Sequence, residues 1–159
     1  MNQLLKDHGK IAILGIGNEL KGDDGLGSFI TKKLSKSFQN NENIFVFDGG
    51  TVPENYTGSI RKINPTHIIL IDAVEMGKEP GYIRLIEKNE IANYNISTHA
   101  MPISFLIRYM EATIGSKIIL IGIQPKSMQL TEEISKEVKK SIEKIIKDLL
   151  EFMYSEKKL

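Results

Sequence analysis

The hydrophobic residues of the chain fall into five short runs, and the segments between the runs carry apolar residues at helical spacing. The runs cover about 10–16, 43–48, 67–73, 81–87 and 117–123. Four of them are nearly continuous and rich in β-branched residues, as expected for strands covered on both faces of a sheet. Helices are predicted at about 25–38, 53–63, 102–114 and 131–154. This alternation predicts an α/β fold, a three-layer α/β/α sandwich with a mostly parallel sheet.

The connection between the third and fourth runs is too short to hold a crossover helix. Residues 74–80 separate them, whereas a parallel crossover needs roughly a dozen residues or more. The fourth strand is therefore expected to be antiparallel and at an edge. Right-handed crossovers place strands two and three on opposite sides of strand one if the chain reverses direction there. We therefore expect the strand order 2-1-3-5-4.

The segment 131–154 has the clearest helical pattern of the chain. Its apolar residues form a single stripe, and Thr131 stands where a capping residue is expected. The stripe contains Ile134, Val138, Ile142, Ile145, Leu149 and Phe152.

Composition narrows the class of protein. The chain has 159 residues, of which 41% are hydrophobic and 26% charged, and this fits one globular domain over 1–159. A net charge of +1 gives no basic field of the kind that binds nucleic acid or anionic lipid. No run approaches the roughly 18 apolar residues of a membrane helix. No signal peptide is apparent either, so we expect a cytoplasmic protein.

Three side chains at the ends of predicted elements are able to bind a metal. Asp24 lies in a Gly-Asp-Asp-Gly segment after the first strand, Asp72 ends the third strand, and His99 precedes the helix at 102–114. Because the chain has no cysteine, a metal would be held by oxygen and imidazole nitrogen. Two carboxylates and one imidazole suit a borderline divalent metal with open coordination positions. The strand order also brings Asp24 and Asp72 to the same edge, where such sheets bind ligands.

Each of these residues also has a structural interpretation. Asp23 and Asp24 could cap the following helix, since Asp is among the best capping residues, and one of the two could cap while the other binds metal. Asp72 could accept hydrogen bonds from loop amides, although a charge at the end of a buried strand is costly unless it is paired or functional. His99 alone is a weak signal.

Other motifs offer weaker candidates. His67 begins the strand that Asp72 ends, roughly 17 Å away, so the two cannot share a metal. A dinucleotide fingerprint starting at Gly15 would need glycine where Leu20 stands, which disfavours a nucleotide-binding oxidoreductase. The segment Asp48-Gly49-Gly50-Thr51 ends the second strand. It is either a flexible turn or a backbone that a peptide can approach closely, since glycine leaves room.

Five segments together closely resemble the nickel–iron hydrogenase maturation endopeptidases, most of all the formate-hydrogenlyase type. Each segment alone is weak, but five in the same order are specific, and they cover nearly the whole chain. They are residues 11–25, 48–55, 71–77, 98–102 and 122–125. The resemblance implies the α/β/α sandwich as well. It places the family's metal-contacting residues on Asp24, Asp72 and His99, and its substrate-recognition segment on Asp48, Gly49, Gly50 and Thr51.

The resemblance implies an endopeptidase that removes the C-terminal extension of a [NiFe] hydrogenase large-subunit precursor. The nickel would already be in the precursor, so the resting enzyme is not expected to hold it tightly. The family is sometimes classed with the aspartic peptidases, and either a metal or an Asp24 or Asp72 carboxylate would activate the water. We expect a monomer that binds neither nucleic acid nor membrane. The alternative is a nickel-dependent checkpoint protein with no hydrolytic step, because the same three ligands would serve both.

Overall fold

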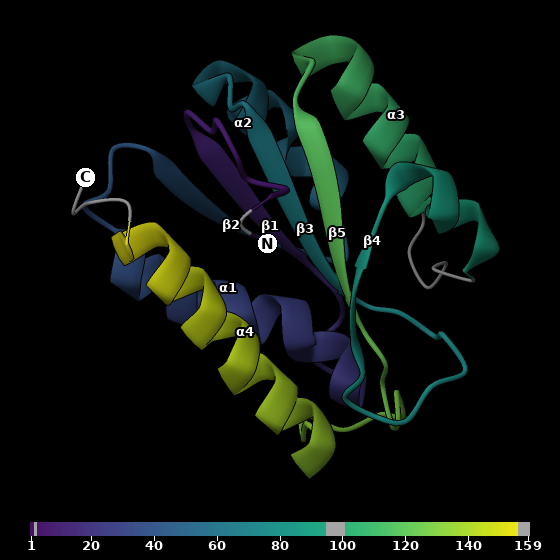
Figure 1. Ribbon diagram of the computed structural model, residues 1–159. Coiled ribbons are helices and arrows are strands. Elements are labelled where there is room, and N and C mark those ends of the chain that lie inside the picture. The colour runs from purple at the N-terminus through teal and green to yellow at the C-terminus, as the bar shows by residue number, and fades with distance from the viewer. Residues whose placement is uncertain (2, 95–100, 156–159) are drawn as a thin grey trace.

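The computed structural model describes residues 1, 3–94 and 101–155, and these form one sheet with helices on both faces (Figure 1). Its strands are β1 (Ile11–Ile16), β2 (Ile44–Gly50), β3 (His67–Ala73), β4 (Ile83–Ile86) and β5 (Lys117–Ile123). Its α-helices are α1 (Leu26–Phe38), α2 (Thr57–Ile63), α3 (Ile103–Ile114) and α4 (Lys136–Ser155). Short 3-10 turns are η1 (Gly22–Gly25), η2 (Pro53–Tyr56) and η3 (Lys88–Asn93).

The sheet has the predicted order β2-β1-β3-β5-β4. β1 pairs in parallel with β2 and β3, β3 pairs in parallel with β5, and β4 runs antiparallel to β5 at the edge. The prediction of a three-layer sandwich is therefore confirmed, and so is the antiparallel fourth strand. The short connection after β3 is the physical reason, because it leaves no room for a helix between β3 and β4.

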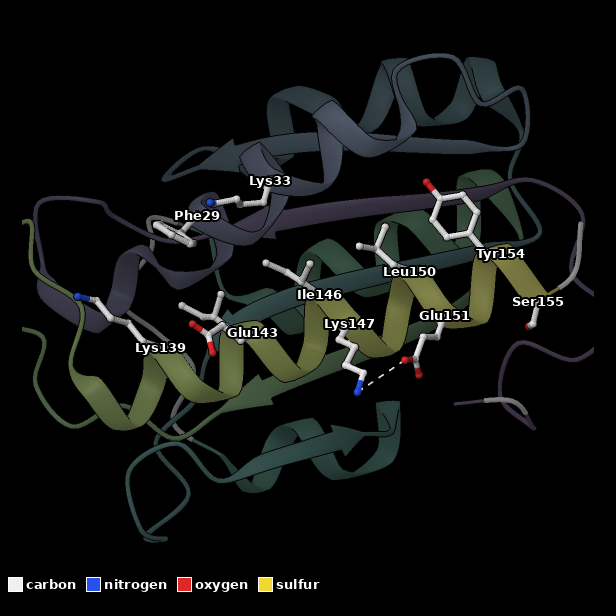
Figure 2. A pocket seen from close by; sticks show the side chains of 11 residues that line it. Phe29, Lys33, Lys139, Glu143, Ile146, Lys147, Leu150, Glu151, Tyr154 and Ser155 are labelled. Carbon is white, nitrogen blue, oxygen red and sulfur yellow. Dashed lines mark ion pairs between the residues drawn. The ribbon is translucent and has the colours of Figure 1, made fainter.

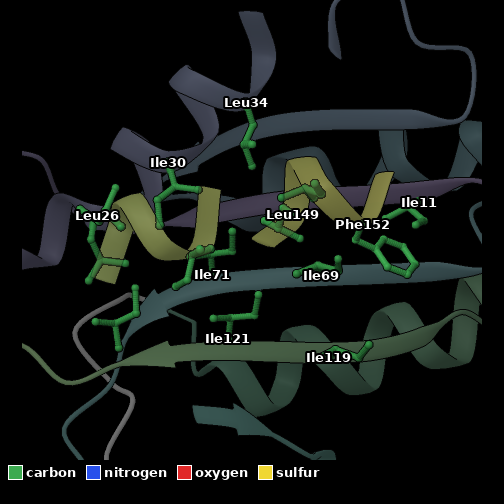
Figure 3. Close-up of a cluster of buried hydrophobic side chains, with 14 of the residues drawn as sticks. Ile11, Leu26, Ile30, Leu34, Ile69, Ile71, Ile119, Ile121, Leu149 and Phe152 are labelled. Carbon is green, nitrogen blue, oxygen red and sulfur yellow. The ribbon is translucent and has the colours of Figure 1, made fainter. Parts of the chain in front are cut away.

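The two faces of the sheet form separate cores. Ile69 and Ile71 of β3 pack with α1 and α4, whereas the alternate residues Ile68 and Leu70 pack with α2 and α3. This alternation follows from the two-residue repeat of a strand, which sends successive side chains to opposite faces. Figure 3 shows the first core, in which Ile30 and Leu34 of α1 meet the strand side chains. Both faces are therefore covered, which explains the continuous apolar runs in the sequence.

The last helix begins later than predicted. α4 starts at Lys136, and the preceding Thr131 forms an isolated bridge with Lys21. The N–H of Thr131 donates to the carbonyl of Leu20 at 3.0 Å, and its carbonyl accepts from Gly22 at 2.7 Å. These bonds hold Thr131 beside Lys21, before α4 begins, so its predicted role as the helix cap is wrong. The predicted helix at 53–63 likewise opens with the 3-10 turn η2 and becomes α-helical at Thr57.

Candidate functional site

The carboxyl edge of the sheet carries Asp24, Asp48 and Asp72. Gly15 near the end of β1 is in register with Asp48 on β2 and with Ile71 on β3. Asp48 and Asp72 therefore end the two strands that flank β1. The topology predicted this placement, and the strand pairs confirm that these ends share one edge (Figure 1).

Helix α1 comes very close to this edge, and this approach requires glycine. A Cβ on Gly27 would lie 2.3 Å from the carbonyl oxygen of Ile16 and 2.7 Å from that of Ile71. No other residue allows the first turn of α1 to lie directly against the ends of β1 and β3. The turn η1, which leads into α1, is therefore held at the edge where β3 presents Asp72.

Asp24 is buried at this edge, with 2% of its surface exposed. The backbone N–H of Asn18 donates to its Oδ2 at 3.0 Å, and this is the one hydrogen bond to its carboxylate within the described residues. Gly17 has a φ of +141°, and a Cβ there would lie 1.8 Å from the Asp24 carbonyl oxygen. The chain after β1 therefore wraps closely around Asp24, and the Asp24 carboxylate accepts fewer hydrogen bonds from the described residues than that of Asp23.

The neighbouring Asp23 is equally buried, at 1% exposure, but its carboxylate is fully engaged. It accepts hydrogen bonds from the backbone N–H groups of Lys126 (2.8 Å), Ser127 (3.2 Å) and Ser135 (2.7 Å), and from Ser135 Oγ (2.9 Å). The N-cap residue of α1 is Gly25, with no side-chain capping bond. The interpretation of these aspartates as helix caps is therefore wrong, and Asp23 instead holds the 126–135 loop against η1.

Asp72 lies within β3 beside Gly122 of β5 and has 1% of its surface exposed. His99, the third predicted metal ligand, lies outside the described residues. No group of three acidic or histidine side chains able to hold a metal is found within residues 1, 3–94 and 101–155. The proposed three-ligand set therefore remains a prediction.

Asp48 has a structural partner that the sequence did not reveal. Ser28 Oγ of α1 donates to Asp48 Oδ1 at 2.6 Å, and Lys32 Nζ lies 3.9 Å from Asp48 Oδ2. Lys32 also pairs with Glu19, and that hydrogen bond raises the pKa of Lys32 above its usual value. These contacts tie the end of β2 to α1.

The two glycines after Asp48 serve different purposes. A Cβ on Gly49 would lie 2.8 Å from the carbonyl oxygen of Gly15, so this glycine is needed for packing. Gly50 has a φ of +54° and open space around its Cβ direction, and its carbonyl accepts the N–H of Gly17 at 2.9 Å. Thr51 is exposed. Gly50 and Thr51 are therefore at least partly open to solvent, and the substrate-recognition role of residues 48–51 stays a prediction.

Gln124 organises the edge more than the sequence suggested. It is 3% exposed, and its Oε1 accepts from the backbone N–H groups of Met76 (2.7 Å) and Lys78 (3.2 Å). Its Nε2 donates to Glu75 Oε1 at 2.8 Å. Gln124 thus anchors the loop between β3 and β4, which leaves the edge directly after Asp72. Its position in the Gly-Ile-Gln-Pro segment at the end of β5 was the available signal.

A large apolar groove lies elsewhere, between α1 and α4 (Figure 2). Phe29, Ile146, Leu150 and Tyr154 line it, with lysine and glutamate side chains around them. None of its lining residues belongs to the predicted site. No helix in the described part of the chain is long and apolar enough to span a membrane.

Comparison with known proteins agrees with this architecture. A family model described as hydrogenase maturation protease matches residues 29–152. The chain is 42% identical over 139 residues to a Methanocaldococcus jannaschii protein that bears the name of a hydrogenase maturation protease, covering 82% of each. It is 40% identical over 114 residues to the hydrogenase 3 maturation protease of Escherichia coli K12, covering 71% of each.

Solved structures show the same fold. The crystal structure of the [NiFe] hydrogenase maturation protease HycI from Thermococcus kodakarensis aligns with a TM-score of 0.86 and 30% identity, covering 94% of this chain and 96% of that one. The fold of this chain is thus that of a solved hydrogenase maturation protease. The chain belongs to the hydrogenase maturation protease family.

Proposed function

We propose that the protein removes the C-terminal extension of a nickel-loaded [NiFe] hydrogenase large-subunit precursor. The family supplies the reaction class, an endopeptidase of hydrogenase maturation. The observation that supports this site is the contrast between the two aspartates of η1. The Asp23 carboxylate accepts hydrogen bonds from the 126–135 loop, whereas Asp24 is as deeply buried but accepts a single hydrogen bond from the part of the chain that the structure describes. A buried carboxylate that structure does not use is a candidate for chemistry.

In this proposal Asp24, Asp72 and His99 contact the nickel that the precursor carries. Two oxygens and one nitrogen leave open positions, so the metal is shared between enzyme and precursor. The shared metal fixes the distance from the site to the scissile bond, and this sets the register of cleavage. Backbone around Gly50 and Thr51 then lies free to receive the extended peptide. Ser28 holds one carboxylate oxygen of Asp48, which positions this segment for the peptide.

The water that attacks the scissile carbonyl is activated by one of two routes. The nickel would polarise the carbonyl or lower the pKa of the water, or the carboxylate of Asp24 or Asp72 would act as the general base. The first route makes the enzyme nickel-dependent, and the second fits an aspartic-type classification. Both routes use the same edge of the sheet.

The enzyme is proposed to be a cytoplasmic monomer. We propose further that it holds no nickel at rest, since three ligands without thiolate bind a metal only moderately. Metal analysis after purification and chelation checks this point, with less than stoichiometric metal expected. Stoichiometric metal that survives prolonged chelation would contradict delivery of nickel by the substrate.

The test of function uses purified enzyme and nickel-loaded precursor, with the precursor's C-terminus read by mass spectrometry. Release of a single C-terminal peptide supports the endopeptidase. Tight nickel-dependent binding with an intact precursor would instead support the alternative, a checkpoint protein without hydrolytic activity.

A further inference from the structure

The outer face of α3 differs from an ordinary solvent-exposed helix face. Phe105 and Tyr109 are 55% and 46% exposed, and Met101 just before the helix is 37% exposed. Arg108 lies over the Phe105 ring, with its Cζ 5.7 Å from the ring centroid. The opposite face of α3 is buried in the core through Ile103, Leu106, Ile107 and Met110. The helix therefore carries large aromatic side chains on its solvent-exposed side as well as an apolar stripe on its buried side.

Helix α4 shows that this is not a general property of the fold. It covers the other face of the sheet, and its exposed residues are charged until its last turn. They are Lys136, Lys139, Lys140, Glu143, Lys144, Lys147 and Glu151. Exposed Phe, Tyr, Met and Arg are the residue types enriched at the centres of protein interfaces, whereas exposed Lys and Glu are depleted there. We define the α3 surface as Met101, Phe105, Arg108 and Tyr109.

The position of the α3 surface indicates which partner binds there. β5 is parallel to β3 and starts at Lys117, directly after α3, so α3 ends at the amino edge of the sheet and Met101 lies beyond the opposite end of the helix. Met101 is two residues from His99, and two residues span at most about 7 Å. If His99 meets the metal of the precursor, as the proposed function has it, the body of the precursor would come close to Met101.

We propose that the α3 surface is the docking site for the body of the hydrogenase large-subunit precursor. The inference rests on the proposed function, because it takes the substrate to be a folded protein that carries its metal to His99. The aromatic side chains would bury against an apolar patch of the precursor, while Arg108 stays on the Phe105 ring at the rim. The surface would supply affinity for the precursor, and the edge of the sheet would supply the chemistry.

The test compares two double variants of the full chain. Phe105→Ala with Tyr109→Ala removes the α3 aromatics, and Phe29→Ala with Tyr154→Ala removes a matched pair from the α1–α4 groove, which is 41% and 48% exposed (Figure 2). Binding of purified nickel-loaded precursor is measured by calorimetry, and cleavage by release of the C-terminal peptide. Thermal melting checks that each variant is folded.

The α3 variant is expected to bind the precursor at least ~10-fold more weakly. Its KM should rise accordingly, while kcat at saturating precursor stays within about twofold, because uniform binding is lost. The groove variant should match the wild type. Phe105→Leu with Tyr109→Phe keeps apolar area and should restore binding, which separates lost contact from lost folding.

Three results would overturn the docking proposal. The first is unchanged precursor binding by the folded α3 variant, and the second is an equal loss in the groove variant. The third is concentration-dependent self-association of the wild type, seen by sedimentation and abolished by the α3 changes, which would make a second copy the occupant. Precursor that binds through α3 without being cut would instead refute the endopeptidase function and leave the docking surface standing.

Discussion

Two parts of the carboxyl edge of the sheet differ in the hydrogen bonds that their buried carboxylates accept. The 126–135 loop has little regular structure of its own, and the Asp23 carboxylate accepts three of its backbone amides, those of Lys126, Ser127 and Ser135. The ends of β1 and β3 have α1 directly against them, and here Asp24 and Asp72 are buried, with Asp24 accepting one hydrogen bond, from the N–H of Asn18, within the described residues. The comparison teaches that burial alone does not reveal a carboxylate's role. What separates the two aspartates of η1 is where their hydrogen bonds go.

The largest expected effect is on activity, from Asp24→Asn or Asp72→Asn. Both changes keep the shape of the side chain and remove the charge proposed to contact the precursor's nickel. Cleavage of nickel-loaded precursor should fall at least ~100-fold, equivalent to about 2.7 kcal/mol of transition-state stabilisation. The free energy of unfolding should change little, because removing a buried charge with a chemical role often leaves stability intact or raises it.

Peptide release and a thermal melt on the same preparations measure both quantities. A melting temperature lowered by ten degrees or more in Asp72→Asn would assign that residue a structural role instead, since this corresponds to more than about 2 kcal/mol for a chain of this size.

The next effect is on stability, from Asp23→Ala. This change leaves the amides of Lys126, Ser127 and Ser135 without their acceptor, and unmade buried hydrogen bonds cost about 1–3 kcal/mol. We expect a loss of about 3 kcal/mol, seen as a melting temperature roughly 10 °C lower. Asp24→Ala is the matched control and should lose less than half as much, because it removes one hydrogen bond. Equal destabilisation by the two changes would contradict the assignment of a structural role to Asp23 and a chemical role to Asp24.

The smallest expected effect is on the pH dependence of stability, and it comes from His67 at the amino edge of the sheet. His67 begins β3 and is 6% exposed, and burial, with the nearby positive charge of Lys117, lowers its pKa below the usual 6.5. The unfolded chain therefore takes up this proton more readily than the folded one. Above about pH 6.5 His67 should not make the free energy of unfolding depend on pH. Below that value it should lower the free energy of unfolding as the pH falls. Urea unfolding at pH 7.5 and 5.5 should show a smaller acid loss in His67→Gln than in the wild type; identical losses would mean that His67 is not the group responsible.

Much of the fold was predictable because the signals are local. The β-branched runs, the short 74–80 connection and the handedness of crossovers determine the strand order without knowledge of any contact. The same order brought Asp24 and Asp72 to one edge. The sequence also supplied the motif containing His99, whose geometry stays a prediction because it lies outside the described residues.

The roles of Asp23 and Thr131 were not predictable, because their partners are distant in the chain. Asp23 accepts hydrogen bonds from backbone amides more than a hundred residues away. Nearly every residue has such an amide, so the sequence does not show which ones are the partners. Thr131 resembles a capping residue, but its bridge to Lys21 prevails over the local preference. Gln124 was noticed only as part of a motif, since its three loop contacts appear only when β3 and β5 are adjacent.

The most direct test of the account is whether the precursor's nickel controls cleavage. One enzyme preparation is given nickel-loaded and nickel-free precursor, and release of the C-terminal peptide is followed by mass spectrometry. The account predicts that nickel-free precursor is cut at least ~100-fold more slowly, because the shared metal supplies about 2.7 kcal/mol of alignment. His99→Ala should lose activity on the loaded precursor for the same reason. Equal rates on the two precursors would contradict the claim that Asp24, Asp72 and His99 sense the metal of the substrate.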